Sequence, residues 1–297
     1  YTLSLHDALP IYICEGEHAD LAEYLECKGI LFKHCKVGII NIDELDHKVL
    51  LKGHTCNIKT YGVKNFADFT ATNKKLIFDT EKLGVSFNLN LQGNFKFPVE
   101  VSIPGEFTVY NALCAIAICF QFNINKESIL KGLSTLKVKG RVEIVPTGKK
   151  FTLIIDYAHN AVSMENILNT LREYRPTRLI VMFGAGGNRP KIRRYEMGEV
   201  AGRLADFCVI TEDNSRFESP GQIMADIEKG LCKNFCQYIV VPCRREAIKF
   251  CISNAKKGDI IVLAGKGHED YQEINGEKYH FDEREIIFDI INSEIKV

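Results

Sequence analysis

The sequence predicts an α/β protein whose C-terminal half folds as a Rossmann-like, doubly wound and mostly parallel sheet. The first observation is that short runs rich in Val, Ile and Phe alternate with stretches of helical periodicity beyond residue 142. The second is size and composition. The chain has 297 residues, enough for two ordinary domains, and 46% of them are apolar, as in a globular protein.

The N-terminal half predicts a smaller mixed unit. Apolar residues recur at helical spacing in its first and last segments, whereas its middle alternates polar and apolar residues in short runs between glycines. The expected elements are a helix over 17–34, a strand over 36–43, a helix, turn and strand within 47–65, a small antiparallel sheet over 66–104, and helices over 105–122 and 125–138.

The C-terminal half predicts five strands separated by four helices. The strands are expected over 151–158, 177–185, 206–213, 237–242 and 259–265, and the helices over 161–175, 190–205, 219–234 and 244–255. We therefore predict two domains, 13–142 and 143–297. Residues 1–12 ("YTLSLHDALPIY") carry neither the charged start nor the cleavage site of a signal peptide and are interpreted as a non-native leader.

Composition argues against several classes of partner. Lys+Arg and Asp+Glu balance at 38 each, so the chain has no overall field to hold nucleic acid or an anionic membrane. No apolar run approaches the roughly 20 residues of a membrane span. The eleven cysteines are scattered without zinc-site spacing and are interpreted as reduced thiols in the cytoplasm.

Polar residues gather where four of the predicted C-terminal strands end. The four segments are "DYAHN" (156–160), "GAGGNRPK" (184–191), "TEDNSR" (211–216) and "AGKGHED" (264–270). Ligands bind beyond the carboxyl ends of strands in open parallel sheets, so these segments predict one binding site. Each segment alone could equally be a polar turn, and the strand order is not visible in the sequence.

The glycine-rich stretch 184–187 is suited to a close approach of backbone to a phosphate or carboxylate at a helix N-terminus. It does not match the GxGxxG fingerprint of dinucleotide-binding proteins, and the phosphate-binding pattern GxxxxGK[ST] occurs nowhere in the printed sequence.

The strings "KGRVEIV", "DYAHN", "FGAGGNRPKIRRYEMG", "TEDNSRFESP" and "AGKGHEDYQ" resemble the Mur ligase family in order and spacing, and the resemblance runs from about residue 17 to the C-terminus. It implies the second part of a central ATPase domain followed by the complete C-terminal, amino-acid-binding domain. It also implies an ATP- and Mg²⁺-dependent amide ligase of peptidoglycan precursor synthesis. Such an enzyme adds the third stem-peptide residue, expected to be meso-diaminopimelate, to UDP-MurNAc-L-Ala-D-Glu through an acyl phosphate.

The resemblance also assigns roles to individual residues. Lys28 matches a lysine that the family carbamylates to hold Mg²⁺; a solvated helix lysine is the alternative. The expected ATP-site residues are Asn111, Arg141, Asp156 and His159, of which Asn111 could instead start a helix and His159 could cap one. The residues expected to bind the incoming amino acid are Arg189, Asp213, Asn214, Ser215, Arg216, Gly265 and Glu269.

The chain departs from the family pattern in three places. Ser215 stands where the diaminopimelate-adding members carry proline, and its hydroxyl is expected to form the turn instead. The phosphate-binding loop is missing, and the Asp-His pair expected near Ile13–Cys14 is not there. The parent protein is expected to be a ligase and a monomer. This chain alone is expected to be inactive, because it lacks these segments.

Three other functions remain open at this point. One is a non-catalytic ligand-binding module on a degenerate ligase scaffold. Another is a different amide ligase of the same superfamily, such as the folylpolyglutamate or D-glutamate-adding type. An oxidoreductase rests only on the alternating strands and glycines, and a fold does not fix a function.

Overall fold

The structure is a computed structural model that describes residues 21–44, 46–79, 82–91 and 95–295. The predicted leader, 1–12, lies outside the described residues. Contacts divide the chain into two compact units, one within residues 1–77 and 84–136 and the other within 78–83 and 137–297. The sequence-based boundary at 142/143 falls a few residues beyond this division.

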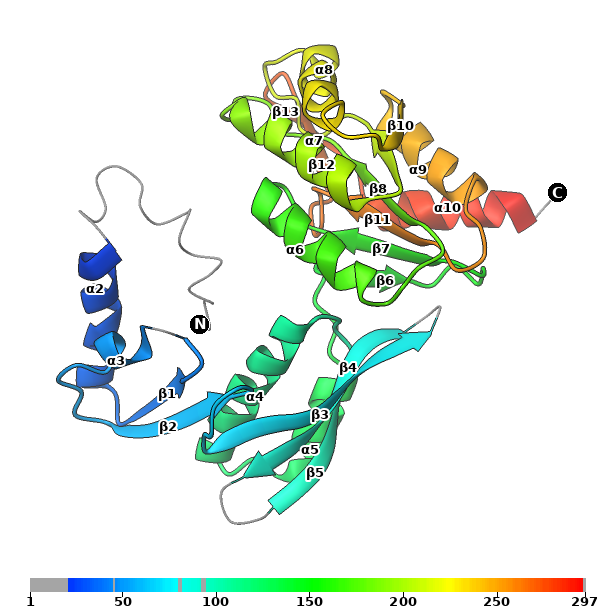
Figure 1. Ribbon diagram of the computed structural model, residues 1–297. Helices are drawn as coiled ribbons and strands as arrows, with labels where there is room; N and C mark the ends of the chain where they lie inside the picture. The colour runs from blue at the N-terminus through cyan, green and yellow to red at the C-terminus, as the bar shows by residue number, and fades with distance from the viewer. Residues whose placement is uncertain (1–20, 45, 80–81, 92–94, 296–297) are drawn as a thin grey trace. The chain divides into compact units, whose positions relative to one another are not determined.

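The first unit is a sheet backed by helices (Figure 1). Its described elements are α2 (Leu21–His34), β1 (Val37–Asn41), α3 (His47–Leu50), β2 (Asn57–Gly62), β3 (Phe69–Asp79), β4 (Lys82–Leu91), β5 (Phe95–Val101), α4 (Glu106–Gln121) and α5 (Lys126–Ser134). The strand order is β1-β2-β3-β4-β5; β1 and β2 pair in parallel, as do β2 and β3, and β4–β5 is the predicted antiparallel pair. Helix α4 buries Val109, Ala112, Leu113 and Ile116, the spacing of one helix face, in the core of this unit.

The second unit is the expected doubly wound sheet. Its elements are β6 (Glu143–Val145), β7 (Thr152–Asp156), α6 (Ala161–Arg172), β8 (Leu179–Phe183), α7 (Ile192–Leu204), β9 (Phe207–Ile210), α8 (Pro220–Leu231), β10 (Gln237–Val240), α9 (Arg244–Ser253), β11 (Ile260–Ala264), β12 (Tyr271–Ile274), β13 (Glu277–His280) and α10 (Glu283–Ile295). All strand pairs of its main sheet are parallel except β6–β7. The prediction of a mostly parallel α/β sheet is therefore confirmed.

Helices cover both faces of this sheet, with α6, α7 and α8 on one face and α9 and α10 on the other (Figure 1). Successive side chains of a strand point to opposite faces, so Ile154 enters the core under the first group and Leu153 and Ile155 enter the core under the second. Both faces being covered, β7, β8 and β11 are buried along their whole length. This explains why these strands are continuous apolar runs in the sequence.

The strand order β10-β9-β8-β11-β7-β6 places the site. Strands β9, β8, β11 and β7 are consecutive neighbours, and they are the four strands that end in the polar segments. Strand β11 lies between β7 and β8, although it follows both by a long stretch of chain. The order of the strands thus reverses at this point, which is where open α/β sheets form a ligand crevice.

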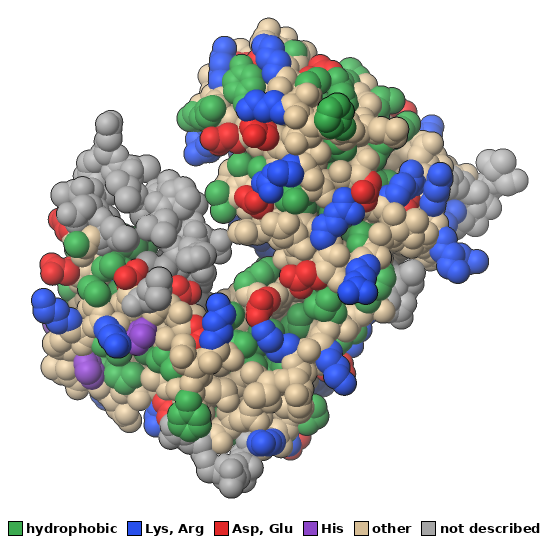
Figure 2. All heavy atoms as spheres, viewed as in Figure 1, with side chains coloured by type: hydrophobic (Ala, Val, Ile, Leu, Met, Phe, Trp, Pro, Cys, Tyr) green, Lys and Arg blue, Asp and Glu red, His purple; other side chains and the backbone are tan. Residues whose placement is uncertain are grey.

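The surface bears charges of both signs. On the face shown in Figure 2, Lys and Arg side chains lie among Asp and Glu side chains, in keeping with the equal totals in the sequence. Within the described residues, no helix combines the length and the apolar character needed to cross a membrane.

Candidate functional site

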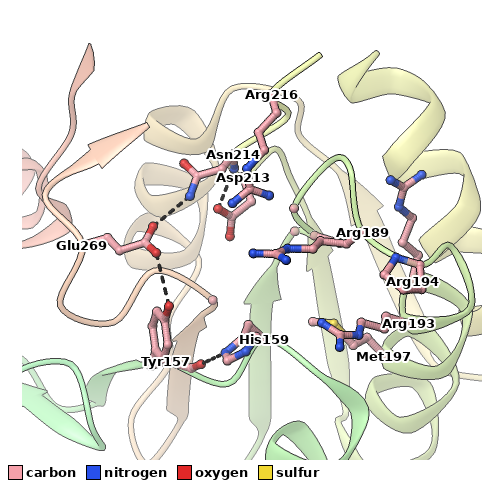
Figure 3. A pocket seen from close by; sticks show the side chains of 15 residues that line it. Tyr157, His159, Arg189, Arg193, Arg194, Met197, Asp213, Asn214, Arg216 and Glu269 are labelled. Atoms are coloured by element: carbon pink, nitrogen blue, oxygen red, sulfur yellow. Dashed lines mark hydrogen bonds between the residues drawn. The ribbon is translucent and has the colours of Figure 1, made fainter. Parts of the chain in front are cut away.

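A cavity of about 210 Å³ lies at the carboxyl ends of β7, β8, β9 and β11 and is closed on one side by the first turns of α7 (Figure 3). One water molecule takes up about 30 Å³ of liquid, so this volume accommodates several waters or one molecule of about amino-acid size. All four polar segments contribute lining residues. The sequence-based expectation that they form one site therefore agrees with the geometry of the strand ends.

One wall of the cavity is cationic. Arg189, from the loop after β8, and Arg193, from the first turn of α7, both line the cavity (Figure 3). Neither guanidinium has a hydrogen bond or ion pair to any described residue, whereas the neighbouring Arg194 is buried and paired with Glu218 and Asp226. Two unpaired cations at the N-terminus of a helix repel its positive dipole end, so an anionic ligand here is electrostatically favoured.

The facing wall is anionic. Glu269 accepts a hydrogen bond from Nδ2 of Asn214 through Oε2, at 2.8 Å, and a longer one from the hydroxyl of Tyr157 through Oε1, at 3.4 Å (Figure 3). Burial and the Glu269 carboxylate raise the pKa of Tyr157, so this hydroxyl keeps its proton and acts as a donor. The carboxylate is held in place while its remaining lone pairs face the cavity.

Two buried cations support this anionic wall. Asp213 Oδ1 lies 3.6 Å from Nζ of Lys266, and Asp213 Oδ2 lies 3.8 Å from Nη1 of Arg244, which also pairs with Glu283. Burial by itself raises the pKa of Asp213, but the charges of Lys266 and Arg244 outweigh it and hold that pKa below its usual value. Asp213 is therefore ionised at neutral pH and is committed to these cations.

Sequence reasoning missed both Lys266 and Arg244. Lys266 stands inside "AGKGHED", where only its neighbours Gly265 and Glu269 were assigned a role. A lysine between two glycines at the end of a fully buried strand was the available signal, because a charged residue in that position must find a partner. Arg244 begins α9, far from the site in sequence, and carried no such signal.

Close packing explains two of the glycines near the cavity. A Cβ at Gly184 would lie 2.4 Å from the carbonyl oxygen of Thr211, and one at Gly187 would lie 2.0 Å from that of Ser215. These two glycines let the loop after β8 lie against the loop after β9. Gly184, Gly186 and Gly265 line the cavity, and Gly265 also needs its positive φ of 112°; an approach of their backbone to a ligand stays a prediction.

Arg216 and Ser215 have different surroundings from those expected. Arg216, whose φ is 49°, donates from Nε to Glu273 at 3.1 Å and from Nη1 to the carbonyl of Gly187 at 2.7 Å, while it still lines the cavity. Ser215 is buried, and its turn is closed by the backbone, with the N–H of Glu218 donating to the Ser215 carbonyl at 3.0 Å. The backbone thus closes this turn, and the expected contribution of the Ser215 hydroxyl stays a prediction.

The residues expected at the ATP site within this unit lie next to the cavity. His159 lines it and contacts the carbonyl of Tyr157 through Nδ1 at 2.8 Å, and the Arg141 guanidinium lies 5.2 Å from the centre of the Tyr157 ring. The oxygens of Asp156 accept from the N–H groups of Val142 and Ala158, both at 2.8 Å, and burial raises the pKa of Asp156. Asp156 thus fixes the backbone beside Arg141; its contact with ATP stays a prediction.

The other two predicted residues belong to the first unit. Lys28 is an exposed residue of α2 whose Nζ lies 5.3 Å from the centre of the Tyr24 ring, and Asn111 is exposed on α4. Among the described residues, no group of three His, Cys, Asp or Glu side chains could hold a metal ion. Residues 13–20, where the family resemblance places neighbours of Lys28, lie outside the described ranges, so the role of Lys28 in holding Mg²⁺ stays a prediction.

Comparison with known proteins accounts for both units. The family model described as "Mur ligase middle domain" matches residues 15–119, and that described as "Mur ligase, glutamate ligase domain" matches residues 140–267. The chain belongs to the Mur ligase family. The second match contains all four polar strand ends up to Gly267, so every residue that lines the charged cavity except Glu269 lies within the matched range.

Several relatives of this Mur ligase chain are named UDP-N-acetylmuramoyl-L-alanyl-D-glutamate--2,6-diaminopimelate ligase, in some cases with a number added. One from Caldanaerobacter subterraneus subsp. tengcongensis is 44% identical over 92% of this chain, and one from Clostridium acetobutylicum is 42% identical over 93%. The chain spans 56% of the length of each of these relatives.

Solved structures agree with this assignment. A solved structure of a UDP-N-acetylmuramoyl-L-alanyl-D-glutamate--2,6-diaminopimelate ligase is 32% identical and superposes with a TM-score of 0.70. The match covers 95% of this chain and 59% of the solved chain. The UDP-N-acetylmuramate-alanine ligase of Thermotoga maritima, at 18% identity and a TM-score of 0.61 over 95% of this chain and 57% of its own, shares the fold.

Proposed function

We propose that this chain is part of an ATP-dependent ligase that adds meso-diaminopimelate to UDP-MurNAc-L-Ala-D-Glu during peptidoglycan precursor synthesis in the cytoplasm. The observation that carries the proposal is the division of charge in the cavity. Unpaired guanidinium groups of Arg189 and Arg193 face the carboxylate of Glu269, and the space between them accommodates one amino acid. The names of the relatives that match over more than 90% of the chain support the same substrate.

Each end of the diamino acid has a chemical counterpart in the cavity. A carboxylate suits Arg189, because a planar guanidinium binds it through two hydrogen bonds. An ammonium suits Glu269 together with the carbonyl oxygen of Gly265. The second carboxylate, which lysine lacks, suits Arg216, because one terminal nitrogen of its guanidinium makes no hydrogen bond to a described residue.

The reaction consists mainly of positioning and charge stabilisation. ATP phosphorylates the carboxylate of the acceptor, the amine of the diamino acid attacks the acyl phosphate, and phosphate leaves. We propose that Arg141, His159 and Asn111 contribute to the ATP side and that Asp156 holds the backbone near Arg141. Mg²⁺ bound through carbamylated Lys28 belongs to the same proposal and would neutralise phosphate oxygens of ATP.

Calorimetric titration of the 297-residue chain with meso-diaminopimelate and L-lysine in parallel tests the substrate assignment. A hydrogen bond to a charged group contributes about 1.5–3 kcal/mol, so we expect lysine to bind at least about tenfold more weakly. Arg189→Gln is the matched variant and should weaken both ligands, because both carry an α-carboxylate. Equal affinity of the wild-type chain for the two ligands would contradict the assignment of diaminopimelate.

A further inference from the structure

Lys266 is a charged residue with no exposed surface that lies behind the anionic wall of the cavity. Its Nζ donates to Oδ1 of Asn214 at 2.9 Å and to the carbonyl oxygen of Tyr271 at 2.6 Å. The same nitrogen is 3.6 Å from carboxylate oxygens of both Asp213 and Glu269. A buried ammonium is costly unless it is paired, so this arrangement requires an explanation.

The first consequence concerns the direction of the Asn214 amide. Two donors, Nζ of Lys266 and the backbone N–H of Glu273, converge on Asn214 Oδ1, each at 2.9 Å. The amide nitrogen must then face the other way, where it donates to Oε2 of Glu269 at 2.8 Å. An inverted amide would place its oxygen against the Glu269 carboxylate and its nitrogen against two donors, so Lys266 excludes it.

The second consequence concerns charge. Three carboxylates, those of Asp213, Glu269 and Glu283, share two buried cations, Lys266 and Arg244. The group therefore has a net charge of −1, and of its three carboxylates Glu269 and Asp213 line the cavity. Without Lys266 a second negative charge would be uncompensated, and the wall would no longer match a single ammonium.

We propose that Lys266 is a positioning residue that fixes Asn214 and Glu269 to accept one ammonium group, and that it thereby gives the cavity its preference for a diamino over a monoamino acid. Lys266 does not itself touch the ligand. The inference rests on the proposed function, because it assumes that the ligand brings a second ammonium to Glu269. Glu269 contacts the second ammonium, and Lys266, which does not line the cavity, holds Glu269 in the orientation that this contact needs.

The test compares meso-diaminopimelate with the two enantiomers of 2-aminopimelate, each of which lacks one of its ammonium groups. Calorimetry on the 297-residue chain should show that the wild type prefers meso-diaminopimelate to one enantiomer by at least about tenfold. In Lys266→Met, affinity for meso-diaminopimelate should fall until that preference is lost, whereas affinity for that enantiomer, which lacks the ammonium at Glu269, should change little. A loss common to all ligands would show a merely structural role and overturn the proposal.

Two further variants keep the test decisive. Lys266→Gln can still donate to Asn214 but carries no charge, so it should retain part of the preference and serves if Lys266→Met does not fold. Arg178→Met removes a different ion pair, which Arg178, itself only partly buried, makes with the buried Asp259, and it should lower stability without changing the preference. An unchanged preference in a folded Lys266 variant overturns the inference alone, whereas a wild-type chain that does not bind meso-diaminopimelate overturns the proposed function as well.

Discussion

Replacing Asp213 by asparagine tests the buried charge network most severely. The substitution keeps the size of the side chain but removes the negative charge that lies 3.6 Å from Lys266 and 3.8 Å from Arg244. Opposite charges about 4 Å apart attract by about 4 kcal/mol at an effective dielectric constant of about 20. The cost of removing three ions from water offsets much of this attraction, so the gross value overstates the net effect.

The net loss follows from what the two cations retain. Breaking a buried pair by removing one partner costs about 3–5 kcal/mol. Arg244 keeps Glu283 at 2.9 Å and Lys266 keeps Glu269 at 3.6 Å, so we expect Asp213→Asn to fall at the lower end, near 3 kcal/mol of unfolding free energy. In a domain of this size, that corresponds to a drop of roughly 6–12 °C in Tm.

The pH dependence gives the sharper assay. The pKa of Asp213 is lower in the folded than in the unfolded chain, so its contribution is present above the unfolded value, about 3.9, and is lost as the pH falls through the folded value. Urea unfolding of wild type and Asp213→Asn should differ most at neutral pH and converge in acid. A difference below about 1 kcal/mol at pH 7, or one that persists unchanged after Asp213 is protonated, would refute the reasoning.

The remaining predictions concern stability measured by the same urea assay. Gly187→Ala should cost at least about 2 kcal/mol, because its Cβ would meet the carbonyl oxygen of Ser215 at 2.0 Å, whereas Gly186→Ala should be tolerated; equal costs would contradict the packing explanation. Arg189→Gln should leave stability within about 0.5 kcal/mol of wild type, and a larger loss would show that this guanidinium has a structural partner. Asn160→Ala should cost about 1 kcal/mol, because its side chain caps the first turn of α6; an unchanged midpoint would show that the cap contributes nothing.

The sequence predicted the architecture of the second unit well because its central strands are continuous apolar runs bounded by polar turns. Helices cover both faces of the sheet, so every residue of β7 and β11 is buried and most of them are apolar. The apolar runs in the sequence therefore marked the positions of these strands. The hairpin of β12 and β13 and the final helix α10 were not predicted. The four exposed residues of β13 show no apolar alternation that would indicate a strand.

The site was only partly predictable for a physical reason. Polar strand ends reveal which residues surround a ligand, but the order of strands that brings them together is a property of the folded sheet. The sequence also does not show which polar residues are already paired. Arg189 and Arg216 look equivalent in their motifs, yet Arg189 has no partner among the described residues and Arg216 is held by Glu273 and Gly187.

A crystal structure of the chain with meso-diaminopimelate tests the central claim most directly. The account predicts one molecule in the cavity beyond β7, β8, β9 and β11, with a carboxylate on the guanidinium of Arg189 and an ammonium within hydrogen-bonding distance of Glu269. A ligand bound elsewhere on the chain, or bound in this cavity with its carboxylate away from Arg189, would contradict it.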